Sequence, residues 1–314
     1  MTQARVVDSD RSVVGDPGSR RHATDVACVF AAAAGHVGID PRRECRSNTA
    51  GAPARNRRRM GSMWASWSRR LGALLFALAV APCAGASPAG VPTTVEVTLA
   101  ERTVRVDVYR PAGMPRGAVI LSHGFTRSRA TLGGHAAAIA EAGAIALTPD
   151  LPYTFDFRRN ARALSELVAT LLAGGTFGAP VQRVVLVGFS AGGLSSLLAA
   201  GAPGVVGYVG LDPFDKVEGG GALGRDVAPG LRTEALLLRA PPSRCNAQAV
   251  AAPWGGLLPR LLEDRLIEGA SHCDFESPTD WMCRLACGET DPKRQDVVRE
   301  GLLGAVERWL PRTP

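Results

Sequence analysis

A buried strand that runs through a glycine-flanked serine into a helix narrows the possible folds of this chain more than any other segment. It reads Val184-Val185-Leu186-Val187-Gly188-Phe189-Ser190-Ala191-Gly192-Gly193 and continues as Leu-Ser-Ser-Leu-Leu-Ala-Ala. Four consecutive apolar residues are typical of a strand buried on both faces, as in a parallel sheet covered by helices. The segment therefore predicts a βα unit with Ser190 at a sharp turn.

The rest of the chain after residue 90 repeats this alternation. Two segments with alternating apolar residues, Val95–Thr98 and Val104–Tyr109, predict a half-exposed antiparallel pair. Short apolar runs predict buried strands at Ala118–Leu121, Ala144–Leu147, Val184–Val187, Val205–Gly210, Ala235–Leu238 and Leu266–Ile267. Helical patterns cover Ala136–Ala142, Arg159–Leu172, Ala191–Ala200 and Gln295–Leu310. We expect an α/β fold with a mostly parallel sheet of about eight strands flanked by helices. The short Gly-rich segment 218–221 leaves no room for a large cap domain.

The glycines around Ser190 are explained by steric constraints at the turn. At a sharp strand-to-helix turn, side chains at Gly188 and Gly192 would clash with the neighbouring backbone, and the serine hydroxyl is exposed. Free N–H groups at the start of the helix, that of Ala191 first, can stabilise a developing oxyanion. A second donor is expected from the loop His123-Gly124-Phe125 after the strand Ala118–Leu121, at the N–H of Phe125. His123 is expected to brace this loop.

A general base for Ser190 is found by elimination. Of the five histidines, only His272 follows Ser190, and it lies after the last predicted strand. An imidazole there can take the serine proton and return it to a leaving group. The orienting acid has two candidates after the strand 205–210, since the loop 239–246 contains no Asp or Glu. Asp212 at the strand tip is preferred to Asp215, which is expected in a turn.

These residues resemble the α/β-hydrolase superfamily over roughly residues 92–312, and within it the branch of chlorophyllases, platelet-activating-factor acetylhydrolases and bacterial polyester hydrolases. The resemblance is carried by His123-Gly124-Phe125, Gly188 to Gly193, Gly210-Leu211-Asp212-Pro213 and Ser271-His272. It implies a Ser190-His272-Asp212 triad, an acyl-enzyme intermediate and no cofactor or metal. The chain departs from chlorophyllases at Ala191, where they usually carry a basic residue.

The resulting functional expectation is a serine hydrolase that cleaves small or polymeric carboxylic esters. A thioesterase or acyltransferase would use the same three residues. The alternative from another class is a catalytically silent binding protein with this fold. We expect a monomer.

The N-terminal part differs in composition from the rest. Residues 1–86 hold 13 of the 36 Lys and Arg but 6 of the 29 Asp and Glu, whereas residues 87–314 hold 23 of each. The whole net charge of +7 therefore comes from residues 1–86, and residues 87–314 carry none. The charge thus gives no support to nucleic-acid binding by the predicted catalytic domain. Arg69-Arg70, the apolar run 71–81 and Ala84-Gly85-Ala86 predict a signal peptide at 64–86 and export after cleavage near Ala86, by the general or the twin-arginine route. Residues 1–63 are expected to be a disordered leader or an over-extended start, and 87–314 the catalytic domain.

The cysteines fit an exported domain. Four of the seven, Cys245, Cys273, Cys283 and Cys287, lie in the predicted mature chain. An even number in an exported protein predicts two disulfides, for which three pairings are open. No apolar stretch after residue 90 is long enough to span a membrane.

Overall fold

Residues 90–218 and 221–311 are described by a computed structural model. The predicted leader at 1–63 and the predicted signal peptide at 64–86 lie outside these residues. Within them, eight strands form one sheet in the order β1-β2-β4-β3-β5-β6-β9-β10. β1 (Thr93–Leu99) and β2 (Arg102–Tyr109) are antiparallel, and β2 is also antiparallel to β4 (Ile145–Pro149).

The other strands of the sheet run parallel to one another, which confirms the predicted fold class. They are β3 (Ala118–Ser122), β5 (Val184–Phe189), β6 (Val205–Leu211), β9 (Glu234–Arg239) and β10 (Leu261–Leu266). The carboxyl ends of parallel strands meet at one edge of a sheet, so the loops after β3, β5, β6 and β10 come together there.

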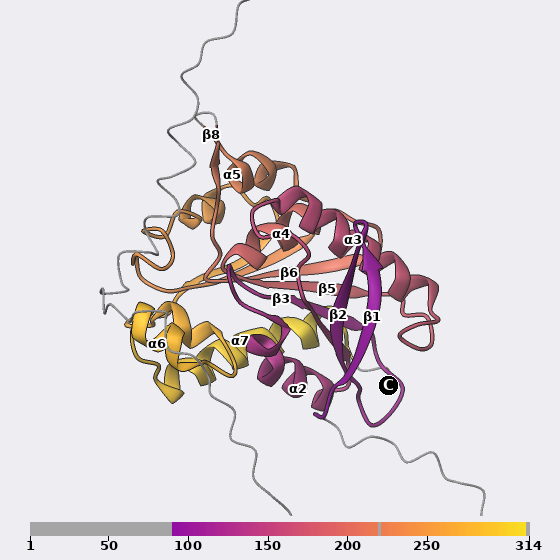
Figure 1. Ribbon diagram of the computed structural model, residues 1–314. Helices are drawn as coiled ribbons and strands as arrows, with labels where there is room; N and C mark the ends of the chain where they lie inside the picture. Colours follow the sequence, from indigo (N-terminus) through magenta and orange to yellow (C-terminus); the bar gives the residue numbers. More distant parts are fainter. Residues whose placement is uncertain (1–89, 219–220, 312–314) are drawn as a thin grey trace, which may run out of the picture. The chain divides into compact units, whose positions relative to one another are not determined.

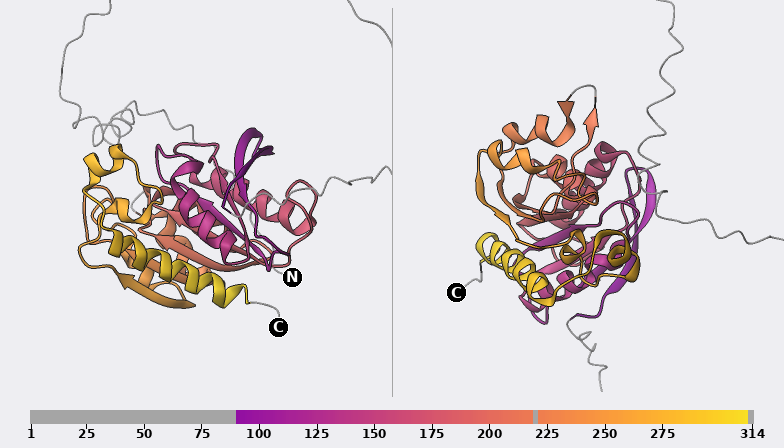
Figure 2. Two further views of the ribbon diagram at one scale, coloured as in Figure 1. Left: turned by 90° about the horizontal axis from the view of Figure 1, so that it is seen from below. Right: turned by 90° about the vertical axis from the view of Figure 1, so that its left-hand side faces the viewer.

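Helices cover both faces of the sheet (Figures 1 and 2). α3 (Phe157–Ala173) and α4 (Ala191–Ala199) lie on one face, and α2 (Gly133–Glu141) and α7 (Pro292–Trp309) on the other. Alternate residues of β5 serve the two layers. Val184 and Leu186 belong to the core under α3 and α4, and Val185 and Val187 to the core under α2 and α7. This two-sided burial explains why the strand reads as a continuous apolar run.

The last strand is where the sequence prediction was wrong. A strand was expected at Leu266–Ile267, but β10 occupies Leu261–Leu266 and Ile267 follows it. β10 is an edge strand of the sheet, and all of its residues are exposed or half-buried, including Glu263, Asp264 and Arg265. A strand with one neighbour and little burial has no reason to be an apolar run, so the pattern pointed to the wrong residues.

Short elements fill the connections between the larger ones. Between β6 and β9 lie β7 (Val217–Glu218), β8 (Gly221–Ala222), α5 (Leu223–Val227) and the 3₁₀ helix η2 (Ala228–Gly230). The others are η1 (Arg129–Leu132), η3 (Ala252–Gly256), η4 (His272–Phe275) and α6 (Trp281–Cys287). No cap domain is evident in the described part of the chain. No helix in that part is both long and apolar enough to cross a bilayer.

Candidate active site

Ser190 lies at the turn between β5 and α4. Its backbone has φ 52° and ψ −121°, and non-glycine residues rarely adopt a positive φ. Its N–H donates to the Leu211 carbonyl at 3.0 Å, and its own carbonyl accepts the Phe214 N–H at 3.0 Å. Both partners belong to β6 or the loop after it, so the neighbouring strand holds the strained turn in place.

The glycines of this turn are required by close packing. A Cβ on Gly188 would overlap the Gly192 carbonyl, and a Cβ on Gly192 would overlap the carbonyls of Ser122 and His123. The turn after β5 therefore packs directly on the loop after β3. A Cβ on Gly124 would lie 3.2 Å from the Cβ of Ser190, which places that loop against the serine itself.

Asp212 follows β6 directly and is 2% exposed. It also has a positive φ, 39°, and its N–H donates to the Leu238 carbonyl at 2.7 Å. Its Oδ2 lies 2.5 Å from Nδ1 of His272, and its Oδ1 accepts the Ala240 N–H at 3.0 Å. The structure therefore brings Asp212 and His272, which are 60 residues apart in the chain, into direct hydrogen bonding.

His272 is the first residue of η4 and is 6% exposed. Its ring packs on Phe189 with 4.6 Å between centroids, and Phe189 immediately precedes Ser190. The bond from Nδ1 to Asp212 leaves Nε2 as the ring nitrogen for proton transfer. The imidazole therefore lies against the residue before Ser190, with its Nδ1 directed at Asp212.

Asn246 is a site residue that the sequence analysis missed. It is fully buried, and its Nδ2 donates to both carboxylate oxygens of Asp212 at 3.3 Å and to the Pro241 carbonyl at 2.9 Å. Its Oδ1 accepts the N–H groups of Ser243 and Ala249 at 2.8 and 2.9 Å. In the sequence, Asn246 lies in a loop that contains Pro and Ser, and such a pattern predicts only a turn.

Asp215, the second acid considered from the sequence, and two further aspartates nearby have structural partners. Asp215 accepts the N–H groups of Lys216, Gly224 and Arg225 and the indole N–H of Trp254. Asp274 accepts bonds from Ser271, Asp291 and Arg294, and Asp150 pairs with Arg105 and Arg129. Asp215 thus anchors the start of α5, whereas Asp212 contacts the histidine.

His123 braces the loop after β3 through a defined tautomer. Its Nε2 accepts the Leu151 N–H at 2.9 Å, so its proton is on Nδ1, which donates to the Gly124 carbonyl at 2.8 Å. Burial lowers the pKa of His123, which favours this neutral form. Because the C=O and N–H of a trans peptide point in opposite directions, fixing the Gly124 oxygen also fixes the direction of the Phe125 N–H.

A cavity of about 180 Å³ adjoins this loop and the start of α4. Its lining includes both candidate oxyanion residues, Phe125 and Ala191, together with Leu151 and Phe157. The ring of Phe125 also contacts the exposed Phe155 at 5.1 Å between centroids. The cavity therefore lies beside the loop after β3 and the residue that follows Ser190.

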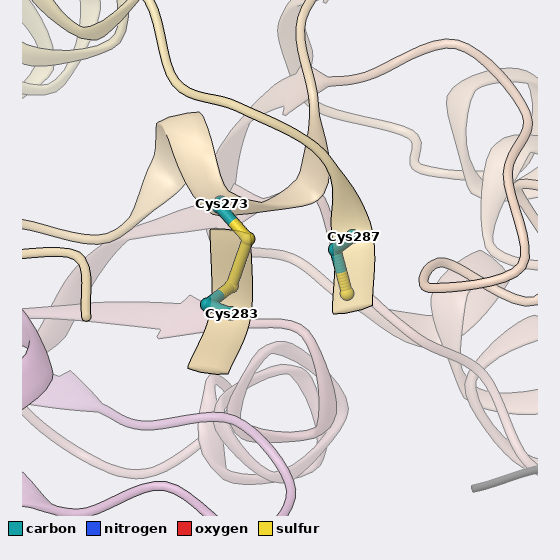
Figure 3. A group of neighbouring side chains, drawn as sticks. All are labelled: Cys273, Cys283 and Cys287. Carbon is teal, nitrogen blue, oxygen red and sulfur yellow. A yellow bond between two sulfur atoms is a disulfide. The ribbon is translucent and has the colours of Figure 1, made fainter. Parts of the chain in front are cut away.

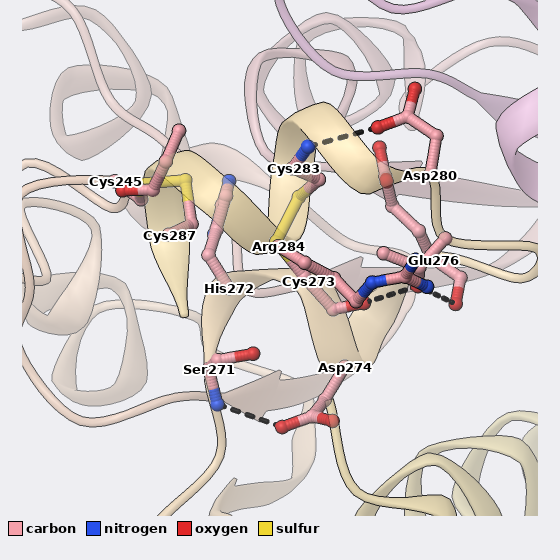
Figure 4. Close-up of a disulfide and its surroundings, with 12 residues drawn as sticks. Cys245, Ser271, His272, Cys273, Asp274, Glu276, Asp280, Cys283, Arg284 and Cys287 are labelled. Carbon is pink, nitrogen blue, oxygen red and sulfur yellow. Dashed lines mark hydrogen bonds between the residues drawn. A yellow bond between two sulfur atoms is a disulfide. The ribbon is translucent and has the colours of Figure 1, made fainter. Parts of the chain in front are cut away.

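The four cysteines of the described region form two disulfides through α6. Cys245 is joined to Cys287, and Cys273 to Cys283 (Figure 4). The sulfurs of Cys273, Cys283 and Cys287 lie within 4.8 Å of one another (Figure 3). Thiolate is the form in which cysteine ligates metals, and disulfide sulfurs are not thiolates, so this cluster is a crosslink. One crosslink starts next to Asn246 and the other next to His272.

Comparisons with known proteins identify the fold of this chain. No protein-family model matches this sequence, and no curated protein matches it. Among solved structures, a dienelactone hydrolase from Anabaena variabilis is similar with a TM-score of 0.54 and 19% identity, over 69% of this chain and 98% of that one. An α/β serine hydrolase without lid from Xanthomonas campestris (TM-score 0.50, 18% identity) covers 73% of this chain and 100% of its own. An α/β serine hydrolase homologue from Coxiella burnetii (TM-score 0.50, 16% identity) covers 68% and 99%. This chain has the α/β-hydrolase fold.

Proposed function

We propose that this chain, with its α/β-hydrolase fold, is a serine hydrolase that cleaves carboxylic esters through an acyl-enzyme. The observation that carries the proposal is the buried bond between His272 Nδ1 and Asp212 Oδ2, next to the strained turn of Ser190. Ser190 is 7% exposed, rather than exposed as the sequence predicted. An imidazole oriented by a carboxylate beside a serine in a strained strand-to-helix turn is the arrangement that activates a hydroxyl nucleophile.

Each residue has one role in the mechanism. Ser190 Oγ attacks the ester carbonyl while His272 takes its proton, and Asp212 holds the imidazole and stabilises its charged form. The N–H groups of Phe125 and Ala191 stabilise the oxyanion of the tetrahedral intermediate. His272 then protonates the leaving alcohol, and the same steps with water release the acid. Asn246 and the Ala240 N–H keep the Asp212 carboxylate directed at His272.

Export and the finer family assignment belong to the same proposal. Two disulfides in the described region are compatible with an oxidising compartment. We place the enzyme outside the cytoplasm, released by cleavage near Ala86, and nearest in kind to the chlorophyllase, acetylhydrolase and polyester hydrolase branch on the segment Gly210-Leu211-Asp212-Pro213. N-terminal sequencing of the secreted protein tests the cleavage site. A mature chain that retains residues 1–59 would refute it.

The activity is tested with p-nitrophenyl esters from acetate to palmitate, comparing the wild-type chain with Ser190→Ala. Loss of the nucleophile should lower kcat on the order of 10³-fold or more. Near-wild-type activity in the variant would exclude Ser190. Faster turnover of the matching thioesters, or transfer to added alcohols, would indicate the thioesterase or acyltransferase alternative. A chain that neither hydrolyses esters nor reacts with a fluorophosphonate would be a catalytically silent binding protein.

A further inference from the structure

Arg127 connects two parts of the site that are far apart in the sequence. It follows Phe125 by two residues in the loop after β3. Its Nε donates to Glu276 Oε1 at 2.6 Å and its Nη2 to Glu276 Oε2 at 2.8 Å. Nη2 also lies 2.9 Å from Asp280 Oδ2. The oxyanion loop is therefore tied to residues that are about 150 positions further along the chain.

The ion pair between Arg127 and Glu276 is buried, and this constrains its geometry. The Glu276 side chain has no exposed surface, and that of Arg127 is 12% exposed. Burial raises the pKa of Glu276, and the bonds from Arg127 act against that rise. The guanidinium of Arg127 meets both oxygens of this buried carboxylate, and its rigid planar shape therefore fixes the separation of the two segments.

The carboxylates that pair with Arg127 lie in the same segment as His272, the proposed general base. Glu276 immediately follows η4, the single turn that begins at His272. Asp280 caps α6 through the Cys283 N–H, and Cys283 is crosslinked to Cys273, the neighbour of His272 (Figure 4). Both carboxylates that hold Arg127 thus belong to the segment that carries the base.

Arg127 itself belongs to the loop after β3, which carries the proposed oxyanion donor. The Arg127 N–H donates to the Gly124 carbonyl at 3.2 Å, the oxygen that His123 also holds. Between Phe125 and Arg127, Thr126 has a left-handed φ of 57°, which the loop maintains only if both of its ends are held. A displacement of Arg127 would therefore rotate the Gly124–Phe125 peptide and its N–H.

We propose that Arg127 is a positioning residue, whose ion pairs with Glu276 and Asp280 fix the Phe125 oxyanion donor relative to His272. The inference rests on the proposed function, because it assigns a distance between two groups that must act on one carbonyl. Arg127 also lines the cavity, but its Nε and Nη2 are committed to carboxylates, so its role is to hold the loop.

The test compares Arg127→Gln, Arg127→Lys and the double variant Arg127→Gln/Glu276→Gln in the full chain. For each, kcat and KM are measured on p-nitrophenyl acetate, together with the second-order rate of fluorophosphonate labelling. We expect kcat and the labelling rate to fall about 10- to 100-fold, with KM within about twofold of wild type, because the donor is misplaced rather than removed. The lysine variant should fall too, since one ammonium cannot hold two oxygens in a fixed plane. The double variant removes the unpaired buried charge, so it should recover thermal stability without recovering kcat.

Arg129→Gln is the matched control. Arg129 lies two residues further on, and it pairs with Asp107 and Asp150 at 2.9 Å, away from the histidine segment. Its loss should reduce stability and leave kcat within about twofold. The proposal is overturned if Arg127→Lys keeps wild-type kcat, if the control loses kcat equally, or if the double variant recovers kcat with stability. A wild-type chain inert to both esters and fluorophosphonate would overturn the proposed function, and this inference with it.

Discussion

Two buried aspartates three residues apart have different surroundings, and that difference predicts different mutant behaviour. Asp212 and Asp215 are 2% and 1% exposed, but only Asp212 contacts His272. Asp212→Asn should lower kcat on the order of 10⁴-fold, because an amide no longer holds the imidazole in its productive tautomer. Asp215→Asn should lower the melting temperature while kcat changes little, because Asp215 accepts backbone and indole N–H groups around α5.

Ester hydrolysis and thermal melts of the two variants decide between the acids. If Asp215→Asn lost activity as severely as Asp212→Asn while still folded, the assignment of the orienting acid to Asp212 would be wrong. Loss of stability without loss of kcat in Asp215→Asn supports the assignment.

At the scale of elements, α6 is crosslinked twice. Cys245–Cys287 closes a loop with a sequence separation of 42, and Cys273–Cys283 one of 10. In the chain-entropy account, the longer loop contributes about 4 kcal/mol and the shorter about 3 kcal/mol to the free energy of unfolding. Replacing Cys245 and Cys287 by Ser should therefore destabilise the protein more than replacing Cys273 and Cys283.

Urea unfolding of the two double-serine variants measures this order. Replacing Cys273 and Cys283 also releases Cys273, the neighbour of His272, from α6. For the same decrease in melting temperature, kcat should therefore fall more in this variant than in the Cys245/Cys287 variant. Equal stability of both variants and the wild type would show that the crosslinks do not constrain the unfolded chain. Equal kcat would show that α6 does not hold the histidine turn.

For the whole molecule, one buried histidine predicts how stability depends on pH. His135 donates from Nε2 to the Phe275 carbonyl at 3.2 Å, and its buried Nδ1 has no partner. Burial lowers the pKa of His135 to about 4 from 6.5. Because the pKa of His135 is lower in the folded than in the unfolded protein, the unfolded chain takes up this proton first as the pH falls. The free energy of unfolding therefore has its full value with respect to His135 above pH 6.5 and decreases as the pH falls toward 4. The loss amounts to about 3 kcal/mol.

Chemical unfolding at pH 7 and pH 4, for the wild type and His135→Gln, checks this expectation. Glutamine can still donate to the Phe275 carbonyl but does not titrate, so its free energy of unfolding should fall less over this range. An equal fall in both proteins would exclude His135 as the source.

Much of the site could be read from local patterns. The glycine-flanked serine, the loop at His123 and the only histidine after the serine are all visible as residues next to strand ends, and the structure places Ser190, Asp212 and His272 around one sheet edge. The weak points were the exposed edge strand β10, the short helix α6 and the side chains that support the site. Asn246 and Arg127 have no distinguishing neighbours in the sequence, and their roles exist only through Asp212 and Glu276.

The amino-acid sequence alone determined the order of the larger strands and helices up to the edge strand β10 and the sharp turn at Ser190, because apolar periodicity and glycine placement act between residues that are neighbours in the chain. Tertiary structure alone decided which acid meets His272, which cysteines are joined and which arginine spans the site. The site contacts join residues that are 34 (Asn246–Asp212), 60 (Asp212–His272) and 149 (Arg127–Glu276) positions apart, and the two disulfides have sequence separations of 42 and 10. Such pairs depend on the paths of several loops over one sheet edge, and no local pattern encodes where those paths meet.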